Sequence, residues 1–167
     1  EDYPQLLKEI HDPPLIIYYK GNLNSGIFEK CFGVVGTRMP TSYGRLVTEK
    51  LTRELSNAGL TIVSGLALGV DAVAHQVTVE MQGSTIAVLG SGVDSISPQS
   101  NVRLANQVLA QGGSIVSEYW PGVEANAGTF PARNRIISGL SKGVLITEGA
   151  ADSGSLITAR AALEQNR

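Results

Sequence analysis

Two kinds of hydrophobic pattern alternate along the chain. Short runs of consecutive apolar residues predict strands buried on both faces, and stretches with apolar residues every three or four positions predict amphipathic helices. The expected strands are 15–19, 32–35, 60–63, 84–89, 114–117 and 143–147. The expected helices are 6–10, 42–58, 70–82, 101–110, about 131–140 and 153–166. This alternation predicts an α/β fold: a doubly wound, mostly parallel sheet with helices on both faces.

The alternation also divides the chain. Residues 1–30 form a flank with a Pro13-Pro14 break, and residues 31–167 form the core, in which we find no internal repeat, charge run or linker. We therefore expect a single domain. The chain stops directly after a helix, where the alternation requires one more strand. We expect it to be part of a larger protein, trimmed at both ends.

The loops that follow the expected strands are the candidate binding surface. Ligands of parallel sheets bind outside the carboxyl ends of the strands, where these loops share one rim. The loops are 36–43, 64–70, 90–100, 118–130 and 148–155. Three of them are rich in Gly, Ser and Thr, whose amides and hydroxyls can bind phosphate oxygens.

The first of these loops begins Gly36-Thr37-Arg38, between an apolar strand and a helix. A strand, glycine turn and helix place backbone amides and a helix N-terminus at the sheet edge, which attracts anions. Arg38 adds a permanent charge with a planar fork of donors, so a phosphate site is one interpretation. The other is that Gly36 merely allows the turn and that Arg38 is a solvated surface charge.

A second group of candidates surrounds Pro131, which suits the first position of a helix because proline has no amide hydrogen to lose there. Arg133 and Arg135 follow in the first turns, and Phe130 precedes them. Guanidinium groups for phosphates and a ring for a base to stack on favour single-stranded nucleic acid. Phe130 could equally be an ordinary core aromatic residue beside a helix start.

Composition narrows the class of protein. With 167 residues, 43% hydrophobic and 17% charged, the chain is typical of a globular domain. The net charge is −2, so a site for a polyanion must be a local positive patch. The single cysteine, Cys31, excludes an internal disulfide, fits a reducing compartment, and is expected to be a core residue rather than a nucleophile. No stretch is apolar enough to span a membrane or act as a signal peptide.

Three patterns in the sequence also admit an enzyme interpretation. Gly90-Ser-Gly92 is a weak match to a dinucleotide motif, because Pro98 and a polar loop separate it from the next helix. Glu118 and Glu148 could be an acid–base pair, or could hold loop amides and arginines in place. Asp71 and His75 lie four residues apart and could be a base with its orienting partner, or simply share a helix face. We find no zinc-binding cluster and no nucleoside triphosphate loop.

A series of motifs resembles the DprA family of DNA-processing proteins, also called Smf, along nearly the whole chain and in the right order. The motifs are Gly36-Thr-Arg38 with Pro40 and Tyr43-Gly44, Ser64-Gly-Leu-Ala-Leu-Gly-Val-Asp71 with Ala74-His75, Ala87-Val-Leu-Gly90, Ser117-Glu118, Phe130-Pro-Ala-Arg-Asn-Arg-Ile-Ile137 and Ser153-Gly-Ser-Leu-Ile-Thr-Ala159. The resemblance implies an extended Rossmann-like core that binds single-stranded DNA without sequence preference. It also implies a cytoplasmic homodimer that protects incoming DNA during natural transformation and loads RecA for homologous recombination, with no cofactor, metal or catalytic activity.

The resemblance assigns roles to individual residues. Arg38 is similar to the family's main phosphate ligand, Phe130 to its base-contacting ring, and Ser64 and Gly65 to backbone and hydroxyl contacts. The basic helix start corresponds to Arg133, Asn134 and Arg135. The remaining expected DNA-binding residues lie in the same motifs: Gly36, Thr37, Gly69, Ser153 and Ser155.

The chain also departs from the family pattern. Leu68 replaces a residue that is usually basic, and Thr129 stands where a histidine or another polar residue is frequent. The alternative is a nucleotide phosphoribohydrolase on a related fold. That enzyme group carries a Gly-Thr pair and a glutamate near its last site helix, and the region Gly149–Ile157 has neither.

Overall fold

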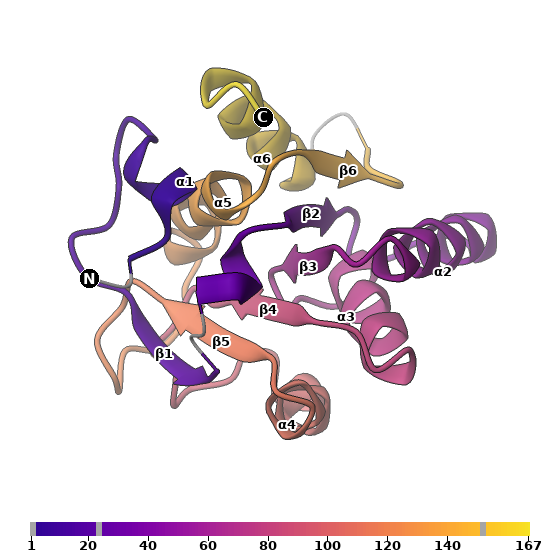
Figure 1. Cartoon of the computed structure of the whole chain (residues 1–167), viewed down its shortest axis with the longest axis horizontal. Coiled ribbons are helices and arrows are strands. Elements are labelled where there is room, and N and C mark those ends of the chain that lie inside the picture. Colours follow the sequence, from indigo (N-terminus) through magenta and orange to yellow (C-terminus); the bar gives the residue numbers. More distant parts are fainter. Residues whose placement is uncertain (1–2, 23–24, 151–152) are drawn as a thin grey trace.

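The computed structural model describes residues 3–22, 25–150 and 153–167. Its centre is a six-stranded sheet in the order β1-β5-β4-β3-β2-β6 (Figure 1). The strands are β1 (Tyr18–Gly21), β2 (Cys31–Val35), β3 (Thr61–Ser64), β4 (Thr85–Val88), β5 (Ser114–Ser117) and β6 (Val144–Ile146). The helices are α1 (Gln5–Lys8), α2 (Ser42–Asn57), α3 (Val70–Glu80), α4 (Val102–Ala110), α5 (Thr129–Leu140) and α6 (Ser155–Glu164), with 3₁₀ turns at Ser25–Phe28 and Gln99–Asn101.

The sheet is doubly wound, as predicted. Strands β2 to β6 pair in parallel, and β1 pairs antiparallel with β5 at one edge, with Tyr18 opposite Ser117. Helices α2, α3 and α4 cover one face, and α1, α5 and α6 lie on the other (Figure 1). The α/β fold class is therefore confirmed.

Burial on both faces explains why the central strands are continuous apolar runs. Every residue of β3, β4 and β5 is buried. Their side chains point alternately to the two faces. On one face Ile86 and Val88 pack with Ile136 of α5, and on the other Ala87 and Ile115 belong to the cluster that includes α4. Neither face could be exposed without uncovering a core.

Most boundaries differ from the predictions by one or two residues, and two differences have a clear physical reason. The first strand was expected at 15–19 but begins at Tyr18, because backbone pairing with β5 starts only there, and Leu15 is 98% exposed. Helix α5 begins at Thr129, so Pro131 is its third residue rather than its first. The predicted position of Pro131 in the helix was wrong. Proline still loses no hydrogen bond at the third residue, because the amides of the whole first turn lack acceptors within the helix.

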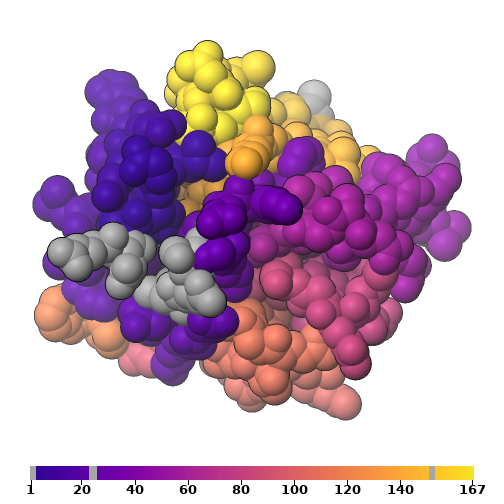
Figure 2. Space-filling view, in the orientation of Figure 1, coloured from indigo at the N-terminus to yellow at the C-terminus, as the bar shows by residue number. Residues whose placement is uncertain are grey.

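The first described residues pack against the core. Leu7 and Ile10 are buried in the same cluster as Ile137 and Leu140 of α5. In the space-filling view the indigo N-terminal residues lie between the yellow C-terminal helix and the orange segment near β5 (Figure 2). This segment closes the outer side of α5.

The strand order creates a topological switch point between β2 and β6. The chain steps from β2 through β3 and β4 to β5, and then crosses back over the sheet through α5 to β6, on the other side of β2. Strands β2 and β6 are therefore neighbours whose following helices, α2 and α6, lie on opposite faces. A crevice is expected at such a switch point.

Candidate nucleic-acid interface

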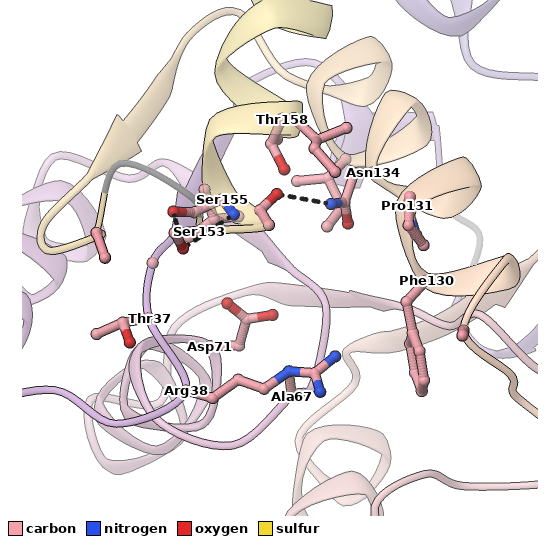
Figure 3. A pocket seen from close by; sticks show the side chains of 17 residues that line it. Thr37, Arg38, Ala67, Asp71, Phe130, Pro131, Asn134, Ser153, Ser155 and Thr158 are labelled. Atoms are coloured by element: carbon pink, nitrogen blue, oxygen red, sulfur yellow. Dashed lines mark hydrogen bonds between the residues drawn. The ribbon is translucent and has the colours of Figure 1, made fainter.

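A crevice of about 650 Å³ lies at this switch point (Figure 3). Its walls come from the loop after β2, the loop after β3, the start of α5 and the start of α6. Seven of the twelve predicted DNA-binding residues line it: Gly36, Thr37, Arg38, Phe130, Asn134, Ser153 and Ser155. Residues more than 110 positions apart in the sequence thus share one surface.

Arg38 and Phe130 form one wall of the crevice. Arg38 is exposed, and its Cζ atom lies 5.1 Å from the centre of the Phe130 ring, at cation–π distance (Figure 3). The same two side chains also line a smaller hollow of about 120 Å³, together with Gly65, Leu68 and Pro98. A permanent charge beside a half-buried ring can contact the phosphate and the base of one nucleotide.

Gly36 and Gly69 permit a close contact between two loops. A Cβ atom on Gly36 would lie 2.6 Å from Val70 Cγ2, and one on Gly69, where φ is +78°, would collide with the Thr37 carbonyl. The amide of Thr37 donates to Glu148 O at 2.7 Å, and the amide of Val70 donates to Thr37 O at 3.1 Å. These amides are therefore used within the fold, and the glycines fix the backbone that carries Arg38.

Ser64 and Gly65 do not present free donors at the rim. Ser64 is fully buried, and its hydroxyl donates to Val34 O at 2.6 Å. The amide of Gly65 donates to Asp71 Oδ2 at 3.0 Å. The sequence expectation that these two groups contact phosphates therefore needs correction, because both hydrogen bonds are satisfied inside the domain.

Arg133 is the clearest difference from expectation. Only 4% of it is exposed, and its Nη1 donates to Gly65 O at 2.7 Å and also to Val88 O. A Cβ atom on Gly65 would lie 2.6 Å from the guanidinium. Arg133 therefore supports the Gly65 loop from beneath and is not available to a strand at the surface. Its spacing of three and four residues from Ile136 and Ile137 could have indicated this inward direction.

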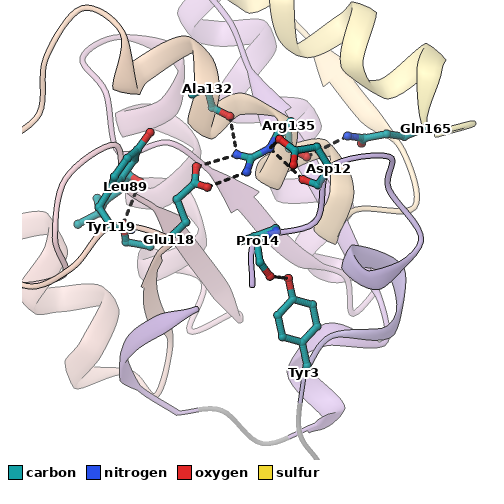
Figure 4. A network of polar contacts seen from close by, with 10 residues as sticks. Tyr3, Asp12, Pro14, Leu89, Glu118, Tyr119, Ala132, Arg135 and Gln165 are labelled. Carbon is teal, nitrogen blue, oxygen red and sulfur yellow. Dashed lines mark hydrogen bonds and ion pairs between the residues drawn. The ribbon is translucent and has the colours of Figure 1, made fainter. Parts of the chain in front are cut away.

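Arg135 points to another part of the molecule. It makes two hydrogen bonds with Glu118, at 2.7 and 2.6 Å, and an ion pair with Asp12 at 3.2 Å (Figure 4). The hydrogen bonds that Arg135 donates to the Glu118 carboxylate raise the pKa of Arg135 above its ordinary value. Arg135 does not line the crevice. Its predicted place beside Arg38 is wrong, and it joins the loop after β5 to the N-terminal segment.

Both glutamates considered as an acid–base pair have structural partners. Glu148 Oε2 accepts hydrogen bonds from Thr41 N at 2.9 Å and Thr41 Oγ1 at 3.2 Å, just before α2. Glu118 holds Arg135. The alternative interpretation, that these carboxylates hold amides and arginines in place, matches these contacts.

Asp71 and His75 are also engaged separately. His75 Nδ1 lies 2.8 Å from Thr85 Oγ1, whereas Asp71 accepts from the amide of Gly65. Burial lowers the pKa of His75 to about 4, so the ring is neutral at physiological pH. Burial raises the pKa of Asp71, and the nearby Arg133 opposes that shift. Within the described residues no hydrogen bond joins the two side chains, so the helix-face interpretation fits better.

The described residues on the opposite side of the crevice are polar but uncharged. The hydroxyls of Ser153 and Ser155 lie 2.8 Å apart, and Asn134 Nδ2 donates to Gly154 O at 3.3 Å (Figure 3). Sequence reasoning missed Thr158, which also lines the crevice. Its position four residues beyond Gly154 in the Ser153–Ala159 motif is the only signal that could have suggested it. Nowhere in the described residues do three His, Cys, Asp or Glu side chains gather as a metal site.

The whole sequence matches the model of a known family. The model for DNA recombination-mediator protein A covers residues 1–167. The chain belongs to this family. Protein Smf of Synechocystis is 49% identical over 169 residues, which are 99% of this chain and 42% of that protein. DNA processing protein DprA of Bacillus subtilis is 44% identical over 100% of this chain and 56% of its own length. The chain thus spans about half the length of these relatives of the recombination-mediator family.

Solved structures of DprA proteins agree with this fold. That of Streptococcus pneumoniae DprA superposes with a TM-score of 0.92 at 42% identity, covering 100% of this chain and 58% of that one. Helicobacter pylori DprA, whose single-stranded DNA binding mode was studied structurally, gives 0.89 at 35% identity over 99% of this chain and 75% of its own. A molybdenum cofactor binding protein of Rippkaea orientalis, at 0.57 and 21% identity over 82% of this chain and 72% of that one, shares the fold alone. The resemblance of the motifs to the DprA/Smf family is confirmed.

Proposed function

We propose that this domain binds single-stranded DNA at the crevice, without sequence preference. The observation that carries the proposal is the Arg38 guanidinium 5.1 Å from the Phe130 ring centre, on an open wall of the crevice. Charge without base-edge hydrogen bonds binds any sequence, and a ring stacks on any base. A duplex hides its base faces, so the ring should favour single strands.

The charge distribution agrees with a short contact rather than a long basic groove. The chain has a net charge of −2, Arg133 is buried, and Arg135 is paired with two carboxylates. Arg38 is therefore the main cation offered to a strand at this crevice. We expect a modest affinity that depends strongly on this one residue.

The wider role rests on the family. DprA of Helicobacter pylori was studied as a single-stranded DNA-binding protein, and relatives carry the name DNA processing protein. By this likeness we propose a non-catalytic role for the larger protein: protecting incoming strands in the cytoplasm during natural transformation and loading RecA, as a homodimer. No helix among the described residues is long and apolar enough to cross a membrane.

The test is the substitution Arg38→Ala, measured with a fluorescent single strand and a matching duplex at several salt concentrations. We expect affinity for all single-stranded sequences to fall by about tenfold or more, and the slope of log affinity against log salt to flatten by roughly one. Arg160→Ala, which removes another exposed arginine away from the crevice, is the matched control and should change little. Unchanged affinity and slope in Arg38→Ala would reject the proposal.

The same preparation tests the proposed lack of catalysis. Glu148 lies outside the crevice lining and holds the residue before α2, so we expect no base to be released from nucleoside monophosphates. Release that persists through purification and is lost on substitution of a crevice residue would support the phosphoribohydrolase alternative instead.

A further inference from the structure

Thr158 is an unexplained polar group in the crevice. It is only 1% exposed, it lines the cavity, and its hydroxyl has no hydrogen-bond partner among the residues that the structure describes. Figure 3 shows this hydroxyl turned toward the interior of the crevice. No described residue uses this hydroxyl as a donor, so a polar ligand in the cavity can accept a hydrogen bond from it.

Other neutral donors surround Thr158. It lies in the second turn of α6, whose ten residues start at Ser155, so the positive end of the helix dipole faces the same space. Ser155 is itself buried, with 6% exposed. The second amide hydrogen of Asn134 Nδ2 remains beyond its single bond to Gly154 O. Hydroxyls, an amide and a helix N-terminus together suit a compact oxyanion.

The shape of the crevice limits what can enter it. Its deep side includes Val35 and Ile137, which are 3% and 1% exposed and belong to the core cluster. A volume of about 650 Å³ suits one ligand of nucleotide size, because small-molecule sites commonly span about 300–1,000 Å³. A strand that continued past this deep side would have to leave the crevice through the core. A strand end or a free nucleotide can occupy the deep side without passing through it.

We propose that the deep side of the crevice, at Thr158 and Ser155, is a separate subsite for the phosphate monoester of a nucleoside 5′-phosphate. This inference rests on the proposed function, since Phe130 would stack on the base and Arg38 would hold the next phosphate. The ligand is a 5′-phosphorylated strand end or a free nucleotide, which share this chemistry. A monoester carries more charge and more free oxygens than a diester, so neutral donors and a helix N-terminus favour the monoester.

The Asp71 carboxylate, which also lines the crevice, does not prevent anion binding there. It accepts the Gly65 amide at 3.0 Å and lies beside the buried Arg133 guanidinium, which is also bound to the Gly65 carbonyl. The positive charge of Arg133 and the hydrogen bond from the Gly65 amide thus offset the negative charge of Asp71. The carboxylate presents little net charge to a ligand.

The experiment compares two oligonucleotides of one sequence, each with a 3′ fluorophore, one with a 5′-phosphate and one with a 5′-hydroxyl. We expect the chain to bind the 5′-phosphorylated strand about fivefold to tenfold more tightly. Thr158→Val, which keeps the shape and removes the hydroxyl, should abolish most of this preference and leave affinity for the 5′-hydroxyl strand unchanged. Ser155→Ala is a second, independent variant and should also abolish most of this preference.

Thr52→Val is the matched control, because Thr52 is also a fully buried threonine whose hydroxyl has no partner, but it lies in α2 away from the crevice. It should keep the full preference. Competition by a deoxynucleoside 5′-monophosphate separates the two sources: competition at concentrations near those of the strand shows that a free nucleotide binds, and its absence shows that a strand end is required.

Equal binding of the two strands, or a preference that survives both Thr158→Val and Ser155→Ala, would overturn the subsite. Because Arg38→Ala is read on the 5′-hydroxyl strand, failure of the subsite and failure of single-strand binding give different results.

Discussion

Three arginines show how the surroundings of a guanidinium decide its role. Arg38 is exposed beside Phe130, whereas Arg133 is 4% exposed and bonded to the carbonyls of Gly65 and Val88. Arg135 is shared between Glu118 and Asp12. A guanidinium whose donors are already satisfied gains little from a phosphate. Only Arg38 is therefore offered to a ligand at the crevice.

Phe130→Leu tests the base-stacking part of the site. Leucine keeps apolar volume but removes the flat ring, so we expect single-strand affinity to fall by about 1–3 kcal/mol. Duplex affinity should change less, so the preference for single strands should shrink. Both are measured by fluorescence anisotropy. Tyr19→Leu, at a half-exposed aromatic residue on edge strand β1, should leave both affinities as they are. A Phe130→Leu protein with unaltered preference would show that the ring is only a core residue.

His75 predicts how stability depends on pH. Burial lowers its pKa from the ordinary 6.5 to about 4. Between these values the unfolded chain binds a proton that the folded chain does not. The free energy of unfolding should therefore fall as pH drops from about 6.5 to about 4, with a contribution of about 3 kcal/mol at most, and this contribution is complete above pH 6.5.

Urea unfolding at a series of pH values checks this. His75→Gln should be less stable at pH 7 and should flatten the curve in that window, whereas substitution of the exposed His11 by Gln should leave the stability at pH 7 unchanged. A His75→Gln curve parallel to the original would show that another group carries the pH dependence.

At the scale of elements, the start of α2 depends on a residue 107 positions away. Thr41 caps the helix by accepting the amide of Gly44 at 3.0 Å, and Glu148 in turn accepts from Thr41 N. Glu148 follows β6, so this contact joins the two strands that flank the switch point. The helix cap and one wall of the crevice are thereby fixed together.

Gly44→Ala tests this contact. A Cβ atom at Gly44 would collide with Glu148 Oε2, so the carboxylate must leave Thr41, and we expect a loss of about 1–2 kcal/mol in the free energy of unfolding. In a Glu148→Ala background the same change should be neutral or stabilising, because alanine is the better helix former. A double-mutant cycle by chemical denaturation measures this coupling. Equal costs in both backgrounds would mean that Glu148 does not restrict position 44.

At the scale of the whole molecule, the N-terminal segment, α5 and the loop after β5 form one connected unit. Arg135 of α5 binds both Glu118 and Asp12, and Tyr3 donates its hydroxyl to Pro14 O at 2.6 Å (Figure 4). Arg167 pairs with Glu9 at 3.5 Å. These contacts join distant parts of the chain behind the crevice. They hold α5, which carries Phe130, against the sheet.

Glu118→Gln tests the unit, because it keeps size while weakening the two-fold contact with Arg135. We expect about 1–3 kcal/mol less stability by urea unfolding and little effect on single-strand affinity. The exposed Glu164, changed to Gln, is the control and should alter neither. If Arg135 binds DNA instead, freeing it from Glu118 would strengthen binding, and that result would restore its predicted role.

The sequence by itself determined the alternation of strands and helices, the doubly wound sheet and the family, because burial patterns and glycine turns are local properties of the chain. It also pointed to Arg38 and Phe130 as candidates, whose chemistry is visible in single residues and which the structure brings together at the crevice. Tertiary structure alone decided which polar groups remain free. Ser64, Gly65, Arg133 and Arg135 have the right chemistry, but their hydrogen bonds are satisfied by partners that are distant in sequence, which no local pattern reveals. The converse holds for Thr158, which the fold buries beside the crevice with no partner for its hydroxyl among the described residues.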